Sequence, residues 1–368
     1  MLRNATLASI VVVGGLACSD DGTELVVDMG TVGRLDSGYD AGALDVGAPR
    51  DLGVEDSGSR DIGFSEPSII GQGRVVLGNV ALYVTARGTL TSTMPPVVIL
   101  PTGPIVGHEY LFGPTEFLLG PGGVSAPDRL LVYADLRATG QSAFAGSGSE
   151  TVVDVESHIR DLENVVGYVD ELLGTTGPVD FLGHGYGAAI AMLYAGRHPE
   201  RVGRLVLANP YPSNIDEYAR WNETFRALLL SDELRRLDDV LRRQSCFSDF
   251  LACSLEIWRI MGPTWLCPEN RAVFDSMRFE SADFRAFEGF IGEDLRLQQY
   301  DWSADMGRVT APSTIISGPC DPIPASAAQT YTASISASTH YVVPESGHFT
   351  ITEQPETFRR IVGRALLR

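Results

Sequence analysis

Three residues in the second half of the chain have the order of a hydrolytic site, but the first lacks a reactive group. The segment 183–187, Gly-His-Gly-Tyr-Gly, has the glycine spacing of Gly-X-Ser-X-Gly, the tight strand-to-helix turn that exposes a nucleophilic serine. Its centre is Gly185, which has no side chain and cannot form an acyl-enzyme. Asp321 and His348 follow in the chain order in which an acid and a base complete such a site. The pattern predicts an acid–base pair without a serine nucleophile.

Two serines close to these motifs do not stand at a turn of that kind. They are Ser142 and Ser346, and neither occupies the centre of a strand-to-helix junction. His184 precedes the turn, and we expect its side chain to point away from the site. One chemical alternative remains open, in which His348 and Asp321 activate a water molecule directly.

Alternating apolar runs and helical patterns predict the elements that would position these residues. Alternation of this kind indicates a mostly parallel sheet with helices on both faces. Between about 211 and 303 the chain has helical patterns and no strand signals, which predicts a helical cap inserted into the domain. The expected strands are 97–100, 130–134, 179–182, 205–208, 314–316 and 341–343, and the expected helices are 152–173, 186–197 and 354–367.

The region 179–210, with its run YAGRHPERVGRLVLANP, resembles the nucleophile turn of the α/β-hydrolase family. A narrower resemblance links 100–112 to the HGGPGxxHxYL segment of prolyl aminopeptidases (proline iminopeptidases), and 135–142 to their DQRGxGxS segment. The similarity covers most of 70–368 and is weakest in the cap. It implies an α/β-hydrolase fold, with Asp321 as the acid and His348 as the base.

The loop after the first of these strands departs from the family pattern at three positions. Pro101 stands where the family has His, Thr102 where it has its first Gly, and Ile105 where it has a later Gly. The resemblance implies that this loop forms one side of the oxyanion hole, in which backbone N–H groups stabilise developing negative charge. It assigns the two amides to Gly103 and Tyr186. The larger side chains predict an altered hole.

We therefore expect a protein that is catalytically impaired or inactive as a serine hydrolase and binds a small molecule or peptide in the cleft under its cap. Two independent changes support this expectation, because removal of the nucleophile typically lowers kcat by about 10⁶. The alternative is an active hydrolase of the aminopeptidase or esterase type that uses His348 and Asp321.

In the resembled family the cap holds acidic groups that bind the free amino terminus of a peptide. The alternative for this chain is that its cap acids are surface charges and its tryptophans are cap-core residues. The candidates are Glu217, Glu223 and Glu256 for the acids and Trp221, Trp258 and Trp265 for apolar walls.

Five cysteines divide into Cys18 and four others, Cys246, Cys253, Cys267 and Cys320. An even number suits an oxidising compartment and leaves three pairings open. We hypothesise that Cys320, next to the predicted acid, tethers the cap to the acid loop. The cysteine and histidine spacing predicts no metal site.

The first 18 residues resemble a bacterial lipoprotein signal that ends at a lipidated Cys18, with an ordinary secretory signal or a start-site artefact as the alternatives. This interpretation predicts an exported, cell-envelope protein that its lipid anchors in the outer membrane. Residues 19–66 carry 12 acidic and 3 basic side chains, a net charge of −9, and predict a disordered linker. Its Asp-Gly repeats do not have the spacing of a defined calcium loop.

The overall charge and the basic residues exclude several classes of function. The net charge of −19 makes a nucleic acid an unlikely partner, because neutralising phosphates requires a basic face. All 28 basic residues are arginine, so lysine-based chemistry such as a Schiff base is excluded. We expect no cofactor.

Overall fold

The computed structural model describes residues 69–77, 80–92, 94–103, 105–120, 128–142, 153–243, 250–279 and 299–367. The predicted signal segment with Cys18, the predicted acidic linker at 19–66 and Cys246 lie outside these ranges.

An eight-stranded sheet forms the centre of the protein, in the order β1-β2-β4-β3-β5-β6-β7-β8. The pairs from β4 through β8 are all parallel, whereas β1 pairs with β2 and β2 with β4 in antiparallel fashion. The predicted mostly parallel sheet is thereby confirmed. The strands are β1 (Ile69–Leu77), β2 (Val80–Gly88), β3 (Val97–Leu100), β4 (Leu130–Asp135), β5 (Val179–His184), β6 (Val202–Ala208), β7 (Ser313–Ser317) and β8 (Ser338–Val342).

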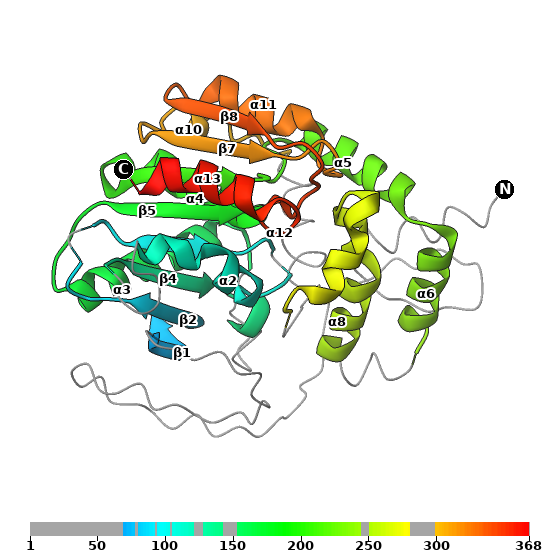
Figure 1. Cartoon of the computed structure of the whole chain (residues 1–368), viewed down its shortest axis with the longest axis horizontal. Coiled ribbons are helices and arrows are strands. Elements are labelled where there is room, and N and C mark those ends of the chain that lie inside the picture. Colours follow the sequence, from blue (N-terminus) through cyan, green and yellow to red (C-terminus); the bar gives the residue numbers. More distant parts are fainter. Residues whose placement is uncertain are drawn as a thin grey trace, which may run out of the picture.

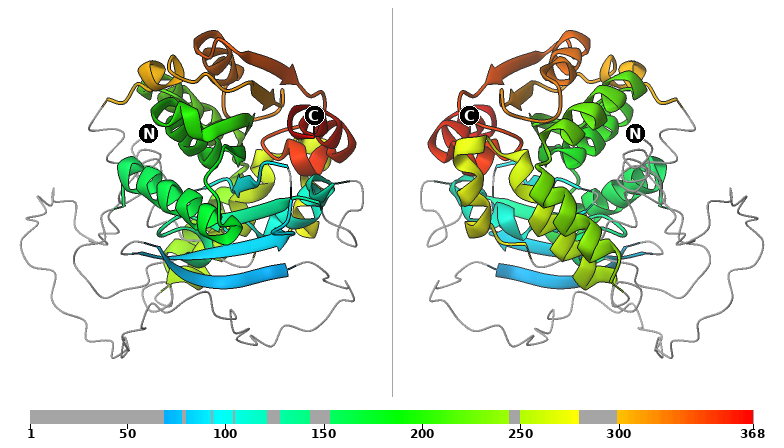
Figure 2. Two further views of the ribbon diagram at one scale, coloured as in Figure 1. Left: turned by 90° about the vertical axis from the view of Figure 1, so that its left-hand side faces the viewer. Right: turned by 90° about the vertical axis from the view of Figure 1, so that its right-hand side faces the viewer.

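The central strands are continuous apolar runs because helices cover both of their faces. Every residue of β3, β4 and β5 is buried, as expected for parallel strands between two helical layers. The helices α3 (Val155–Leu173) and α4 (Tyr186–Arg197) contact each other on one face, and α2 (Phe112–Thr115) contacts α13 (Pro355–Leu366) on the other (Figure 2).

Local sequence signals define where α3 begins and ends. The Asp154 carboxylate accepts a hydrogen bond from the Ser157 amide, and the Ser157 hydroxyl accepts one from the Asp154 amide. The two bonds form a capping box. Gly174 ends the helix in a left-handed conformation with φ 63°. Val155, Ile159 and other buried residues at helical spacing form its apolar face.

The described part of the predicted cap consists of helices at the carboxyl end of the strands (Figure 1). They are α5 (Ile215–Leu228), α6 (Ser231–Leu241), α8 (Phe250–Met261), η6 (Gly262–Trp265) and η7 (Pro268–Ser276). An isolated bridge pairs Asn214 with Asp301, and the Ile215 amide donates to the Tyr300 carbonyl. The two ends of the inserted segment therefore meet at one place on the domain.

The remaining short elements connect the sheet to its covering layers. They are η1 (Glu109–Leu111), η2 (Glu116–Leu119), η4 (Gly140–Ser142), η5 (Pro199–Arg201), α10 (Ser303–Met306), α11 (Ala325–Ser334) and α12 (Thr350–Glu353). Within the described ranges, no helix combines the length and apolar character needed to cross a membrane.

Candidate active site

The turn between β5 and α4 has the geometry of a nucleophile position without a nucleophile. Gly185 has φ 55° and ψ −118°, a conformation that residues with side chains rarely adopt. A Cβ on Gly187 would lie 2.5 Å from the Pro101 carbonyl oxygen, so this glycine permits the close approach of α4 to the loop after β3. The glycines preserve the turn, and the residue at its tip has no group to react.

His348 and Asp321 form a hydrogen-bonded pair beside that turn. His348 Nδ1 lies 3.0 Å from Asp321 Oδ2, and both side chains are almost fully buried. Asn209 Nδ2 also donates to Asp321 Oδ2 at 2.9 Å, and the Ile323 amide donates to Oδ1 at 2.9 Å. Since a carboxylate only accepts, Nδ1 of His348 donates this hydrogen bond, and Nε2 is the ring nitrogen left to act as a base. The acid and base predicted from the sequence are therefore brought together.

The structure adds a hydroxyl that sequence analysis did not assign to the chemistry. Thr102 Oγ1 lies 3.0 Å from His348 Nε2. A Cβ built on Gly185 would overlap that hydroxyl and would stand 2.9 Å from both His348 Nε2 and Thr102 Cβ. The Thr102 side chain thus occupies the space that a side chain at the turn would need. The hydroxyls of Ser142 and Ser346 instead donate to the carbonyls of Asp135 and Val343.

A second buried connection joins Thr102 to His348 behind the cavity. The Thr102 amide donates to the Tyr110 hydroxyl at 2.8 Å, and that hydroxyl lies 2.6 Å from His184 Nδ1. His184 Nε2 lies 2.8 Å from the His348 carbonyl oxygen, which only accepts, so Nε2 carries the proton. Burial, with His348 nearby, holds the pKa of His184 well below its ordinary value, and burial raises the pKa of Tyr110 well above its own. Both groups are neutral and position the backbone.

Thr102 and His348 line an apolar cavity of about 50 Å³. Gly103 and Tyr186, the residues assigned to the oxyanion hole by resemblance, line the same cavity. The cap segment contributes Tyr211, Trp221, Asn222, Phe225, Trp258, Met261 and Trp265 to the wall, and the domain adds Ile105 and Ile323. None of these lining residues is an acid or an arginine. The three tryptophans proposed as apolar walls are therefore at the cavity.

The three cap acids proposed to bind an amino terminus lie elsewhere. Glu217 is buried and accepts from the Ser213 amide and from the hydroxyls of Ser213 and Thr330. Glu256 pairs with Arg243 on the surface, and Glu223 is exposed. The alternative stated for these acids, that they are structural and surface charges, fits their positions.

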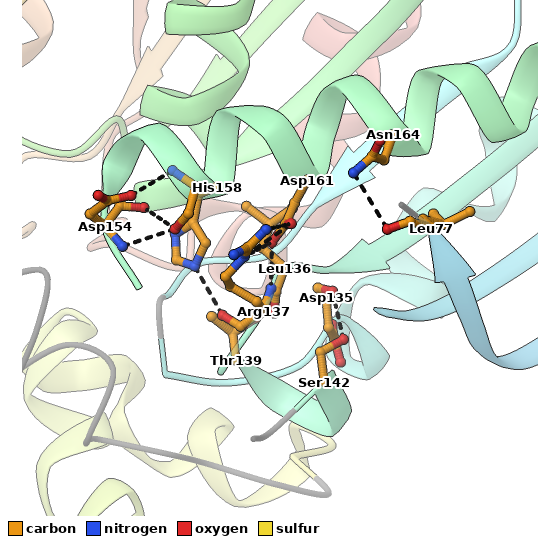
Figure 3. Close-up of polar contacts among 11 residues, drawn as sticks. Leu77, Asp135, Leu136, Arg137, Thr139, Ser142, Asp154, His158, Asp161 and Asn164 are labelled. Atoms are coloured by element: carbon orange, nitrogen blue, oxygen red, sulfur yellow. Dashed lines mark hydrogen bonds and ion pairs between the residues drawn. The ribbon is translucent and has the colours of Figure 1, made fainter. Parts of the chain in front are cut away.

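A buried polar network contacts Tyr186, and Figure 3 shows its members Arg137, His158 and Asp161. Arg137 forms a buried ion pair with Asp161, at 2.6 Å between Nη2 and Oδ1. His158 lies on α3, with Nε2 2.9 Å from the Arg137 carbonyl oxygen and Nδ1 2.9 Å from the Tyr186 hydroxyl. Burial lowers the pKa of His158, so the ring is neutral. The segment 135–142 is thereby joined to the first residue of α4.

The cap segment that contains Trp265 and Cys267 is fastened to the loops of Asp321 and His348. Cys267 and Cys320 form a disulfide, which confirms the hypothesis that Cys320 tethers the cap to the acid loop. Cys253 is also disulfide-bonded. The His348 amide donates to the Trp265 carbonyl at 2.7 Å.

Glu353 makes a further connection between the cap and the histidine loop. It accepts from the Cys267 amide at 2.8 Å and from the Gly347 amide at 2.7 Å. Burial raises the pKa of its carboxyl, because the charged form loses hydration. The position of His348 thus depends directly on the cap.

In the part of the chain that the structure describes, no group of three or more His, Cys, Asp and Glu side chains is arranged to hold a metal ion.

The fold and the arrangement of these loops are those of one class of protein. A model described as the alpha/beta hydrolase family matches residues 97–361. The chain belongs to the alpha/beta hydrolase family.

Solved structures with the same fold include several hydrolases. The chain is similar to the 2-hydroxy-6-oxo-6-phenylhexa-2,4-dienoate hydrolase from Rhodococcus sp., with 19% identity, a TM-score of 0.58 and coverage of 82% of this chain and 99% of that one. It is similar to proline iminopeptidase from Mycobacterium smegmatis, with 18% identity, a TM-score of 0.54 and coverage of 81% and 98%. It is also similar to a proline iminopeptidase-related protein from Thermus thermophilus, with 18% identity and a TM-score of 0.54. That match covers 80% of this chain and 98% of the other. At these identities the likeness shows the fold.

Proposed function

We propose that this protein hydrolyses small, uncharged, apolar esters in the cavity beneath its cap. The supporting observation is that His348, held by Asp321 at 3.0 Å, is one of the residues that line an aromatic cavity. A neutral imidazole oriented by a carboxylate is a general base for acyl transfer. Of the two functions expected from the sequence, this arrangement favours the active hydrolase.

The size and chemistry of the cavity support the substrate class. A volume of about 50 Å³ holds a few water-sized groups, so it suits a short or compact acyl chain. Three tryptophans and one phenylalanine are among the lining residues and favour apolar groups. An ammonium group would lose hydration there, and the described residues that line the cavity include no carboxylate to replace it. We therefore favour esters over peptides with a free amino-terminal proline, although two similar structures are a proline iminopeptidase and a related protein.

Ester hydrolysis by the purified protein tests this proposal. We expect turnover of 4-nitrophenyl acetate and none of proline 4-nitroanilide. His348→Ala should lower kcat/KM for the ester by at least about a hundredfold, the usual contribution of a general base. His198→Ala is the matched control, because His198 lies outside the cavity in an exposed pair with Glu163. Equal rates for natural protein and His348→Ala would refute the proposal.

Gly185 supports a second candidate, a cleft that binds a small molecule or peptide without turnover. The absence of a side chain at the turn is the observation in its favour. Calorimetric titration with the stable ketone analogues of the tested esters distinguishes the two. Binding that His348→Ala leaves intact, together with no ester turnover, would favour this candidate.

We also propose that the chain is exported and that Cys18 carries a lipid anchor to the outer membrane, with the segment 19–66 as the tether. The sequence pattern of the first 18 residues supports this proposal. Metabolic labelling with palmitate should mark the natural chain and leave Cys18→Ser unlabelled. Equal labelling of the two chains would refute it.

A further inference from the structure

We propose that Thr102 supplies the nucleophile of this site, in place of the serine that Gly185 lacks. This inference rests on the proposed hydrolase function and adds the atom that attacks. Thr102 Oγ1 lies 3.0 Å from His348 Nε2. Because Nδ1–H of His348 donates to Asp321, Nε2 accepts and the threonine hydroxyl donates. A hydroxyl that donates to an imidazole oriented by a carboxylate is the arrangement that activates an alcohol for attack.

The position of the hydroxyl relative to the turn supports the same conclusion. A Cβ on Gly185 would overlap the Thr102 hydroxyl and lie 2.9 Å from His348 Nε2. The threonine hydroxyl therefore reaches, from the end of β3, the space beside the base that a side chain at the turn would fill. Gly187 makes this possible, because its missing Cβ lets the loop of Pro101 and Thr102 pack against α4.

Thr102 is also held in a fixed position at the cavity wall. Its amide donates to Tyr110, which contacts His184, and His184 contacts the His348 carbonyl. The backbones of the hydroxyl residue and the base residue are thus connected through two buried neutral side chains. Because the nucleophile and its base are already held in position, less entropy is lost when the transition state forms. Thr102 is also one of the residues that line the cavity of the proposed substrate.

The proposed reaction conserves atoms and charge through two steps. Thr102 Oγ1 bonds to the ester carbonyl carbon as its proton passes to His348 Nε2 and the carbonyl π electrons move to oxygen. The carbonyl re-forms, the carbon–alkoxide bond breaks, and the alcohol leaves with the proton from His348. A water molecule then attacks the acyl-threonine, gives a proton to Nε2 and releases the acid, and that proton returns to Thr102 Oγ1.

Covalent labelling tests the inference independently of turnover. Diisopropyl fluorophosphate should phosphorylate Thr102, with formation of the Oγ1–phosphorus bond, loss of fluoride and transfer of the proton to His348. The full chain would be treated, cleaved at arginine and sequenced by mass spectrometry across peptide 88–129, which contains Thr102. We expect the adduct on Thr102 in the natural protein and its loss in His348→Ala. Absence of an adduct on Thr102 would overturn the inference.

Kinetics of two matched variants separate a nucleophile from a structural hydroxyl. Thr102→Val keeps the branched shape without the hydroxyl and should lower kcat for 4-nitrophenyl acetate about a thousandfold or more. Thr102→Ser keeps the hydroxyl, so its kcat should stay within about tenfold of the natural value and residue 102 should still be labelled. Circular dichroism on both variants verifies folding. If Thr102→Val hydrolysed the ester at the natural rate with His348 still required, water would be the nucleophile; the proposed function would stand and this inference would fail. If the natural protein turned over no ester, the proposed function would fail, and the labelling would still decide for or against Thr102.

Discussion

The side chain of Thr102 and a side chain at Gly185 cannot both occupy this site. A Cβ on Gly185 would overlap the Thr102 hydroxyl and come within 2.9 Å of Thr102 Cβ. Restoring a serine at the turn therefore requires a change at both positions, and the single change introduces an overlap in a packed site.

We predict that Gly185→Ser alone lowers the free energy of unfolding by about 1–3 kcal/mol, the usual cost of overpacking. The double variant Gly185→Ser/Thr102→Gly should relieve the overlap and move the diisopropyl fluorophosphate label to position 185. Urea unfolding and peptide mapping check the two parts, with Thr102→Gly as the control. A Gly185→Ser protein as stable as the natural one would contradict the steric argument.

Asn209 is predicted to stabilise the acid loop through its amide and its backbone. Asn209 Nδ2 donates to Asp321 and to the Gly347 carbonyl, and the residue has φ 48°. Asn209→Gly should lower the free energy of unfolding by about 1–3 kcal/mol, because it removes a hydrogen bond to a charged group. Asn209→Ala should lower the free energy of unfolding by about 1 kcal/mol more than Asn209→Gly does, since alanine is strained at this φ. Equal stabilities of the two variants in urea unfolding would show that the backbone contributes nothing.

The disulfide between Cys267 and Cys320 should contribute strongly to stability. It joins residues 53 apart in the chain. Closing a loop of that length in the unfolded chain corresponds to about 4 kcal/mol in the chain-entropy model. We expect Cys267→Ser/Cys320→Ser to lose up to that amount in guanidinium unfolding. Non-reducing peptide mapping must find the two cysteines linked to each other, and a free Cys320 in the natural protein would rule out the tether.

Glu109 gives a pH-dependent prediction. Burial and the neighbouring Asp135 raise its pKa above the ordinary 4.5, and Oε2 is buried without a hydrogen-bond partner. The folded protein then binds this proton more tightly than the unfolded chain, so stability is lost as pH rises from 4.5 through the raised folded pKa.

Glu109→Gln removes the charge and keeps an acceptor for Gln141, which donates to Oε1 at 2.7 Å. We expect the variant to match the natural protein near pH 4 and to exceed its free energy of unfolding by about 1–3 kcal/mol at pH 7, the cost of an unpaired buried group. Thermal unfolding across this pH range measures the difference. A gap that stays constant with pH would show that titration of Glu109 is not its origin.

Most of the fold follows from the sequence pattern. The buried runs of β3 to β6 and the helix that follows Gly185 lie where their apolar periodicity predicts them, because parallel strands covered on both faces must be apolar throughout. The hairpin of β1 and β2 was not predicted. β1 is the edge strand, and exposed residues alternate along it with less exposed ones, which gives a weaker signal than a continuous apolar run.

The sequence by itself determined the glycine turn without a nucleophile, the order of Asp321 and His348, and the family to which these motifs belong. Chain order and turn chemistry are local properties, so residue types and spacing reveal them. Only the tertiary structure decided that Thr102 stands beside His348, 246 positions away in the chain. That contact depends on how closely α4 approaches the end of β3, and the packing of two elements, together with the absence of a Cβ at Gly187, sets this distance. Sequence spacing carries no measure of it.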